Sequence, residues 1–321
     1  MPIVAVLGGP TASGKSAIAL RWARARGLEI LSADSRQLYR GFAIGTGAPT
    51  AEEQALVPHH LVGHTDPGEA FSPQRFRVEA QSIVESRPES RFLIVGGTGL
   101  YLKEWMRPSA ASGEEPGSVF NMPADIRAAA DREIALRGGA AVHADLSAKD
   151  PGGMEGVAPQ DLYRIQKRLE NWLLTGKSYR REARETPPNP LFENVPFLWL
   201  DPERASLHRN IEARVRVMFA RGWIDEVRDL LRLHDPETTP AFNALGYREI
   251  ADVLRENRGG VKSLPATILE NILARTRQYA KKQTTFFRNQ FEPAPRAFTP
   301  DDLLQRLESS GWEPKTLFKP E

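Results

Sequence analysis

The 321-residue sequence contains no cysteine. This absence excludes a disulfide framework, a thiolate nucleophile and a zinc site built on cysteine, and it suits a cytoplasmic protein. Long hydrophobic runs are missing too, and no stretch approaches the length of a membrane span. The apolar run near the start lacks a leading basic region and a small-residue cleavage site, so it predicts a core strand rather than a signal peptide.

There is also little net charge. Lysine and arginine number 43 and aspartate and glutamate 41, which leaves a formal charge of +2. A total this small does not by itself indicate a nucleic-acid partner, so the distribution of charge matters more. With 40% apolar and 26% charged residues, the composition is that of an ordinary globular protein, long enough for one large domain or two smaller ones.

A phosphate-binding loop is predicted in the first stretch of the chain, IVAVLGGPTASGKS. The fixed positions of the pattern G-x-x-x-x-G-K-[ST] are filled by Gly9, Gly14, Lys15 and Ser16. A strand is expected over 3–7 and a helix over 15–26, the context that the pattern requires. Backbone N–H groups and the helix N-terminus favour phosphate oxygens, Lys15 is expected to reach the distal phosphate, and the Ser16 hydroxyl suits Mg²⁺. The alternative is a plain glycine turn.

Two further strands are expected over 28–32 and 92–95. Ligands of open parallel sheets bind outside the carboxyl ends of the strands, which places Asp34 near the phosphate loop. Alternatively Asp34 is a turn residue, because Asp-Ser favours turns. The strand over 92–95 ends in Gly96 and Gly97 rather than in a magnesium-binding carboxylate, which argues against ordinary ATP hydrolysis or an ordinary kinase. These glycines allow a ligand or another backbone to approach closely.

A mostly helical insertion is predicted at roughly 109–196. Loose stretches rich in proline, glycine or serine divide this region at 108–123, 150–160 and 186–190. Helices are expected over 124–138 and 160–175. Joined to the core by flexible connections, such an insertion is a natural clamp. The alternative is a set of ordinary surface loops within one domain.

A buried strand over 194–202 is expected to return the chain to the core, followed by a helix with Ser206 as its N-cap. The buried stripe of this helix is predicted to be Leu207, Ile211, Val215 and Met218. Arg214 lies at the edge of the stripe, and a cation at the border of a core usually has an assigned partner. On a purely structural interpretation, Arg214 would form an ion pair with Glu212 or another carboxylate.

Positive charge concentrates in a helical block over 268–289. No acidic residue occurs between Asn271 and Phe291. Aromatic residues are interleaved with the basic ones, which gives the series Arg275, Arg277, Tyr279, Lys281, Lys282, Phe286, Phe287 and Arg288. This composition suits a phosphate backbone with unstacked bases, whereas the alternative is a solvated basic helix with its aromatic side chains in the core.

Two other features carry no predicted chemistry. His59 and His60 are adjacent, with no third ligand at metal spacing, so local contacts are expected of them. A last helix is expected over 301–307, capped by Thr299 with Pro300 at its first position.

In their order and spacing, seven blocks of this sequence resemble the tRNA dimethylallyltransferases, which modify adenosine next to the tRNA anticodon. The blocks read GPTASGKS, SADSRQLYRGFAIGT, PHHL, GGTGLYLK, LTGKS, ALGYRE and RTRQYAKKQTTFFRN. The resemblance covers nearly the whole chain, and the blocks after the phosphate loop are the more specific ones. Two departures stand out, since Ala48 replaces a frequent lysine and the segment 107–160 matches weakly.

The resemblance implies an α/β fold, a P-loop NTPase-like parallel sheet flanked by helices. It implies a catalytic core formed by 1–108 and 197–321, with 109–196 as a helical domain that clamps tRNA. The implied reaction moves a dimethylallyl group from dimethylallyl diphosphate to N6 of adenosine 37, with Mg²⁺ at Ser16 and release of diphosphate. The implied partner is the anticodon stem-loop of tRNA. The protein is expected to be a cytoplasmic monomer that does not associate with a membrane.

Residue roles follow from the same resemblance. Diphosphate binding falls to Gly9, Pro10, Thr11, Ala12, Ser13, Gly14, Lys15 and Ser16. The catalytic residues are Asp34, as general base, and Arg214, as the clamp on the diphosphate. Binding of tRNA falls to Asp34, Ser35, Arg36, Gln37, Thr98, Arg127, Arg164, Lys167, Asn243, Gly246, Tyr247, Arg248, Lys281, Lys282, Gln283 and Arg288.

Two other classes of protein remain open. A P-loop kinase of a small molecule would use Lys15 and Ser16 on ATP, but the missing carboxylate after Val95 and the basic aromatic helix count against it. A non-catalytic RNA-binding protein would leave Asp34 and the phosphate loop without a purpose. A loop suited to the β-phosphate of a nucleotide is equally suited to a diphosphate ester, so no nucleotide is required.

Overall fold

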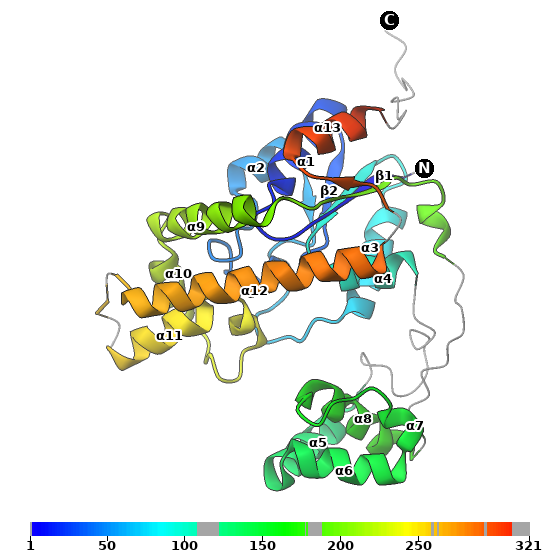
Figure 1. Cartoon of the computed structure of the whole chain (residues 1–321), viewed down its shortest axis with the longest axis vertical. Coiled ribbons are helices and arrows are strands. Elements are labelled where there is room, and N and C mark those ends of the chain that lie inside the picture. Colours follow the sequence, from blue (N-terminus) through cyan, green and yellow to red (C-terminus); the bar gives the residue numbers. More distant parts are fainter. Residues whose placement is uncertain are drawn as a thin grey trace, which may run out of the picture. The chain divides into compact units, whose positions relative to one another are not determined.

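The computed structural model describes residues 2–107, 122–176, 178, 188–257, 260–261, 263–291 and 294–309. The chain divides into two compact units (Figure 1). The sheet unit comprises Met1–Phe71, Phe76–Lys103 and Pro190–Glu321, and the helical unit comprises Ser72–Arg75 and Glu104–Asn189. Most of the expected insertion, 109–196, falls in the helical unit, although nearly all of the loose stretch over 108–123 lies outside the described residues.

The sheet unit is built on six parallel strands in the order β3-β2-β4-β1-β5-β6. The strands are β1 (Ile3–Gly8), β2 (Glu29–Ser32), β3 (His59–His60), β4 (Phe92–Gly96), β5 (Phe197–Leu200) and β6 (Arg296–Ala297). Strand β1 is central and buried along its whole length, with Val6 opposite Ile94 of β4 and Leu7 opposite Leu198 of β5. This arrangement confirms the predicted P-loop-like parallel α/β sheet.

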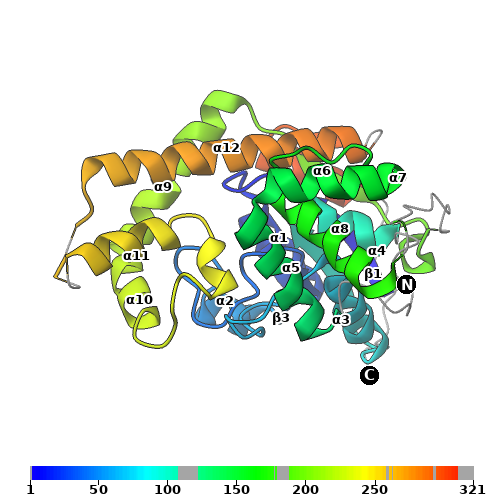
Figure 2. The ribbon, with the colours of Figure 1, turned by 90° about the horizontal axis from the view of Figure 1, so that it is seen from below.

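Helices flank this sheet and extend to one side of it (Figure 2). They are α1 (Lys15–Arg26), α2 (Ala51–Leu56), α3 (Pro73–Glu85), α4 (Gly99–Met106), α9 (Arg204–Ala220), α10 (Trp223–Leu230), α11 (Tyr247–Glu256), α12 (Ala266–Gln290) and α13 (Pro300–Ser309), with 3₁₀ turns at Pro190–Phe192 and Pro240–Asn243. One hydrophobic core lies between the sheet, α1 and α13, and a second joins α9, α10, α11 and α12. The 25-residue helix α12 lies beside α9 in both views.

Helix boundaries follow the sequence where glycine or proline marks them. Helix α1 spans Lys15–Arg26 as predicted, because Gly14 (φ 90°) and Gly27 (φ 60°) adopt left-handed conformations at its two ends. The cap of α13 is also confirmed, since the Asp302 N–H donates to Thr299 Oγ1 at 3.1 Å.

The predicted N-cap of α9 is wrong. The helix begins two residues before Ser206, at Arg204, directly after the Pro202-Glu203 pair. Ser206 therefore lies in the first turn, where its Oγ accepts a hydrogen bond from Arg209 Nη2 at 2.9 Å. The predicted stripe is confirmed, because all four of its side chains are buried, namely Leu207, Ile211, Val215 and Met218.

Four helices lie wholly within the described residues of the helical unit. They are α5 (Ala124–Arg137), α6 (Gly139–Lys149), α7 (Pro151–Met154) and α8 (Leu162–Thr175). Its small core is formed by side chains such as Val142, Leu146, Ile165 and Leu169. It thus has a hydrophobic cluster separate from the two cores of the sheet unit.

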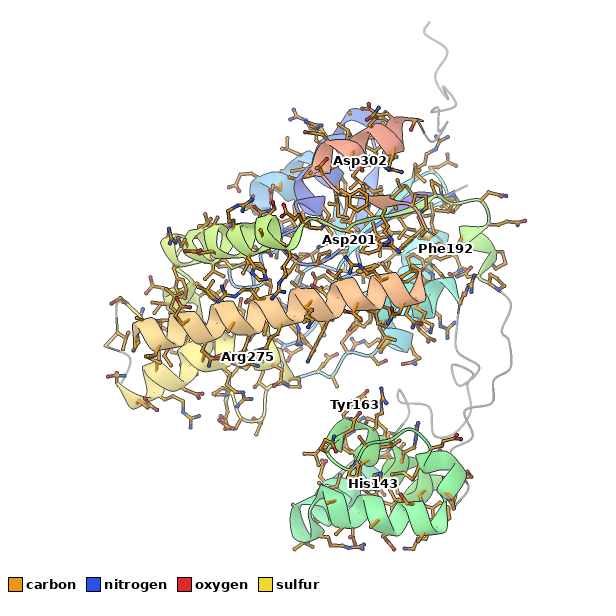
Figure 3. The ribbon with its side chains drawn as sticks, in the orientation of Figure 1. His143, Tyr163, Phe192, Asp201, Arg275 and Asp302 are labelled. Atoms are coloured by element: carbon orange, nitrogen blue, oxygen red, sulfur yellow. The ribbon has the colours of Figure 1, made fainter. Side chains whose placement is uncertain are left out.

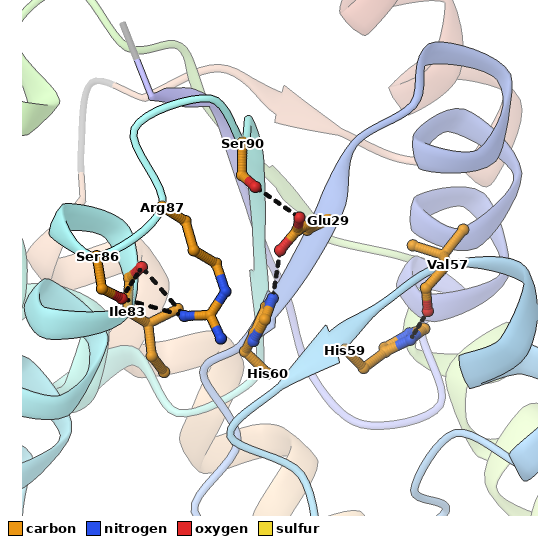
Figure 4. Close-up of polar contacts among 8 residues, drawn as sticks. All are labelled: Glu29, Val57, His59, His60, Ile83, Ser86, Arg87 and Ser90. Atoms are coloured by element: carbon orange, nitrogen blue, oxygen red, sulfur yellow. Dashed lines mark hydrogen bonds and ion pairs between the residues drawn. The ribbon is translucent and has the colours of Figure 1, made fainter.

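The two adjacent histidines make local contacts at the β2–β3 edge of the sheet (Figure 4). His60 Nε2 lies 2.6 Å from Glu29 Oε2, and Ser90 Oγ donates to Glu29 Oε1 at 2.6 Å. Burial raises the pKa of Glu29, but the hydrogen bonds with Ser90 and His60 outweigh it and leave that pKa below its ordinary value. His59 Nδ1 donates to the Val57 carbonyl at 2.7 Å. No group of three acidic, histidine or cysteine residues in the described part of the chain could hold a metal ion.

Among the helices that the structure describes, none has the length and apolar character that a membrane crossing requires.

Candidate active site

The phosphate loop connects the carboxyl end of β1 to the N-terminus of α1. Gly9 adopts φ 140°, and a Cβ there would come within 3.1 Å of the Leu200 backbone oxygen, so a side chain does not fit. The loop wraps around the Lys15 side chain, which is only 7% exposed and donates from Nζ to the Pro10 carbonyl at 3.1 Å. No described side chain caps the start of α1, so this end of the helix is suited to an anion.

Burial sets the protonation of Lys15. It lowers the pKa of the ammonium group from 10.5 to about 8, with Asp34 raising that pKa and Arg214 lowering it. The charges of Lys15, Asp34 and Arg214 therefore interact, and the lysine loses its proton at about pH 8. The negative charge of a bound diphosphate would stabilise the protonated form of this buried lysine.

We expect the affinity of the protein for inorganic pyrophosphate to fall as the pH rises through about 8. Below this pH Lys15 carries its proton, and above it the ammonium form declines about tenfold per pH unit. Isothermal titration calorimetry between about pH 7 and about pH 9.5 measures the effect. The variant Lys15→Met is the control, because the ratio of the two affinities cancels the titration of pyrophosphate itself. A ratio that stays constant across this range would contradict the expectation.

Asp34 lies just after β2, where it forms a turn and also lines a pocket. Its Oδ1 accepts the Arg36 N–H at 2.9 Å, which is an Asx turn, and the residue also lines a pocket. The next residue, Ser35, donates its N–H to Thr98 Oγ1 at 2.9 Å and so joins the ends of β2 and β4. Among the described residues only Oδ1 receives a hydrogen bond, which leaves Oδ2 for a ligand.

Arg214 reaches the same pocket from α9. Its Nη2 donates to the Thr46 carbonyl at 2.9 Å. Burial lowers the pKa of the guanidinium and Asp34 raises it. The suggested structural partner, Glu212, instead accepts from Arg216 Nη2 at 2.5 Å, so a pairing of Arg214 with Glu212 is wrong. With one hydrogen bond to the described residues, Arg214 keeps other N–H groups for a ligand.

One pocket of the sheet unit joins these elements. Thr11, Asp34, Arg36 and Arg214 form its polar side. Its apolar side is formed by Ile211, Val215, Met218, Trp223 and Leu245. A pocket with a phosphate loop and a guanidinium beside an apolar wall suits a ligand with a charged head and a short hydrocarbon chain.

Helix α12 packs against the backbone that follows β1 and β4. A Cβ at Gly97 would clash with Gln283, and one at Gly99 would clash with Phe286. Gln283 bridges the two strand ends, because its Oε1 accepts the Thr11 N–H at 2.8 Å and its Nε2 donates to the Gly97 carbonyl at 2.9 Å. Gly96 packs against the backbone of Ala33. The close approach of another backbone, predicted for these glycines, is confirmed at Gly96, whereas the contact of Gly97 and Gly99 with α12 was not predicted.

The residues expected to bind tRNA in the sheet unit differ in exposure. Lys281, Lys282 and Asn243 are exposed, whereas Tyr247 and Gln283 are buried and bond inside the protein. Direct contact of those two side chains with RNA would require them to leave these bonds.

Three of the basic residues of the sheet unit already have partners. Arg248 Nη1 lies 3.1 Å from Glu237, and Arg288 makes a two-pronged contact with the buried carboxylate of Asp201, at 2.9 Å from Nη2. Arg275 forms an ion pair with the buried Glu249. Of these, the side chains of Arg275 and Arg288 are about half exposed, so each also presents N–H groups to solvent.

The remaining expected RNA contacts lie in the helical unit. Arg164 pairs with Asp161 at 3.3 Å, and Lys167 pairs with the fully buried Glu170 at 2.6 Å. Arg127 on α5 is partly buried, and its Nε has no hydrogen-bond partner among the described residues. Lys167 also lies 6.0 Å from the ring centre of the exposed Tyr163, labelled in Figure 3. Helix α8, which carries Tyr163, Arg164 and Lys167, therefore presents both charged side chains and an aromatic ring.

A glycine-rich loop at the carboxyl edge of a parallel sheet, beside a pocket lined by a carboxylate and a guanidinium, defines a P-loop-like α/β protein with a site suited to a phosphorylated ligand. The sequence itself identifies the family within this class. The chain belongs to the IPP transferase family, whose family model matches residues 37–290.

Individual relatives agree over nearly the full length. The chain is 39% identical over 312 residues to a tRNA dimethylallyltransferase of Halorhodospira halophila, covering 95% of this chain and 94% of the relative. It is 37% identical over 303 residues to that of Phenylobacterium zucineum, covering 94% of both. The crystal structure of the full-length tRNA isopentenylpyrophosphate transferase of Bacillus halodurans is 28% identical, with a TM-score of 0.62 over 97% of this chain and 98% of the other. The resemblance in the motifs is thereby confirmed.

Proposed function

We propose that this chain transfers the dimethylallyl group of dimethylallyl diphosphate to N6 of adenosine 37, beside the anticodon of tRNA. Membership of the IPP transferase family supports the class of reaction. The observation that supports the proposal is the shared pocket, which is lined by Thr11 of the phosphate loop, the carboxylate of Asp34 and the guanidinium of Arg214.

In the proposed reaction the N6 nitrogen attacks C1 of the isoprenoid, a C–N bond forms, and the bond from C1 to the diphosphate oxygen breaks. Negative charge then develops on the leaving diphosphate, and donors already in place stabilise it. Lys15 and Arg214 supply positive charge, and the N–H groups at the start of α1 supply hydrogen bonds. The Thr11 N–H is not among them, since it is bonded to Gln283.

Asp34 has the chemistry to receive the proton that N6 loses. The lone pair of this amino group is delocalised into the purine ring, so the nitrogen is a weak nucleophile unless its proton is removed as the new bond forms. A carboxylate within hydrogen-bond reach can do this, and the free Oδ2 of Asp34 is the acceptor in the pocket. The adenine must first leave its stack, at a cost of about a few kcal/mol that RNA contacts elsewhere offset.

Mg²⁺ fits the site as an ion carried by the diphosphate. The described residues offer no cluster of acidic, histidine or cysteine ligands, but Ser16 presents an exposed hydroxyl at the first turn of α1. Mg²⁺ commonly takes one or two protein ligands and completes its shell with phosphate oxygens and water. When bound, it would neutralise charge on the leaving group, with Ser16 as its protein ligand.

We further propose the anticodon stem-loop as the RNA element, the helical unit as a clamp on it, and a cytoplasmic monomer as the working form. The two exposed lysines of α12, Lys281 and Lys282, offer charge to the RNA backbone.

The test is transfer of label. Purified protein is incubated with labelled dimethylallyl diphosphate and an unmodified anticodon stem-loop that carries adenosine at position 37, and a second RNA has guanosine at that position. Label in the first RNA alone is the expected result. Parallel reactions with labelled ATP and small-molecule acceptors test the kinase alternative. If phosphate moves and the isoprenoid does not, the kinase replaces the proposed function.

A further inference from the structure

A short loop over 43–47 forms one wall of the pocket and fixes two site residues. Gly45 and Thr46 line the pocket, and the Thr46 carbonyl is the acceptor for Arg214 Nη2. The Gly47 carbonyl accepts Gln37 Nε2 at 2.9 Å. The position of the Arg214 guanidinium therefore depends on the path of this loop.

The loop is in turn held by one carboxylate, that of Glu226 on α10. Its Oε2 accepts the N–H groups of Ala43 at 3.0 Å and of Ile44 at 2.7 Å. Its Oε1 accepts the Gly45 N–H at 3.3 Å and the Tyr247 hydroxyl at 2.6 Å. Both oxygens thus act only as acceptors, and four donors converge on this one side chain.

Packing against Trp223 also restricts the loop. The fully buried indole of Trp223 lies between Gly45 and Gly246, and a Cβ on either glycine would clash with it. The hydroxyl of the buried Tyr247 also accepts the Gly45 N–H at 3.0 Å. Hydrogen bonds from Glu226 and Tyr247 on one side, and the indole on another, define where the Thr46 carbonyl stands.

We infer that Glu226 is a positioning residue of the pocket: by holding the N–H groups of the 43–47 loop, it sets the Thr46 carbonyl that orients Arg214 toward the diphosphate. The identity of the substrate rests on the proposed function, but the positioning does not. Inorganic pyrophosphate alone can report on it, whether or not the protein transfers an isoprenoid.

The test is a double-mutant cycle on the affinity for inorganic pyrophosphate, measured by calorimetry. We expect Glu226→Gln to weaken this affinity about tenfold, because an amide offers one acceptor oxygen and presents donors to N–H groups. In an Arg214→Gln background the same substitution should change it by less than about twofold. The neighbouring Asp225→Asn is the control, since its side chain is 75% exposed and, among the described residues, pairs with Arg228 at the surface.

A purely structural role would give a different pattern. Glu226→Gln would then lower the melting temperature and leave the pyrophosphate affinity of the folded protein unchanged, or it would weaken the affinity equally in both backgrounds. Either result overturns the inference. If Glu226→Gln does not fold, Tyr247→Phe takes its place in the cycle, because it keeps the buried ring and removes one hydrogen bond to Glu226. A weakening of about two- to threefold that vanishes with Arg214→Gln is then expected.

Labelled transfer separates this inference from the proposed function. If the wild-type protein binds pyrophosphate but transfers no isoprenoid to RNA, the proposed function fails while the cycle still decides the role of Glu226. If transfer occurs, Glu226→Gln should raise KM for dimethylallyl diphosphate by about the same factor as it weakens pyrophosphate, with KM for the RNA unchanged.

Discussion

Replacing Asp34 by asparagine is expected to lower single-turnover transfer to the anticodon stem-loop by about 100-fold or more. General-base help is typically worth about 10²–10⁴ in rate, and an amide cannot accept the N6 proton. The substitution keeps an oxygen that can accept the Arg36 N–H, so the turn after β2 should persist. Rapid-quench measurement with saturating diphosphate reports the rate of the chemical step, and a filter-binding titration reports RNA affinity, which should stay within about threefold.

A matched control is available in the same unit. Asp66 also accepts a backbone N–H two residues on, that of Gly68 at 2.9 Å. It is exposed and does not line the pocket. Asp66→Asn therefore removes the same charge from the same kind of turn and should leave the rate unchanged. Transfer by Asp34→Asn at close to the wild-type rate would remove Asp34 from the proposed chemistry.

Replacing Arg214 by glutamine is expected to lower kcat/KM for dimethylallyl diphosphate by about 100-fold. The guanidinium faces the pocket, and its loss removes both positive charge and paired N–H donors from the leaving group. Steady-state kinetics with the diphosphate varied at saturating RNA measure the change. Arg214→Lys, which keeps a charge without the planar fork, should recover only part of it.

Arg216 provides the comparison on the same helix. It pairs with Glu212 at the surface, and its side chain is 74% exposed, so Arg216→Gln should leave the kinetics unaltered. If Arg214→Gln lowers the melting temperature and leaves kcat and KM at wild-type values, Arg214 serves the stability of the fold and not the reaction.

The sequence was most informative where local chemistry decides the structure. Strand β1, helix α1 and the glycine-lined turn between them follow from residues within a few positions of one another, and each was predicted within one residue of its observed bounds. Asp34 was placed at the carboxyl edge because parallel strands end together there. The start of α9 was misplaced since serine caps and proline-terminated loops give similar local signals.

Contacts between distant residues left no such signal. Gln283 bonds to Thr11 across 272 positions, and Glu226 bonds to Ile44 across 182. Nothing near Glu226 in the chain distinguishes it from an exposed helical glutamate. Likewise, the charges on α12 were visible in the sequence, but the pairing of Arg288 with the buried Asp201 was not, because only the fold brings them together.

The hydrogen bond that Gln283 makes with the phosphate loop spans 272 positions of the chain. During synthesis the loop therefore emerges from the ribosome long before Gln283, which accepts its Thr11 N–H. A chain that lacks α12 would carry the motif without this hydrogen bond. Contacts this far apart are also the slowest to close in folding, so we expect the pocket to mature late.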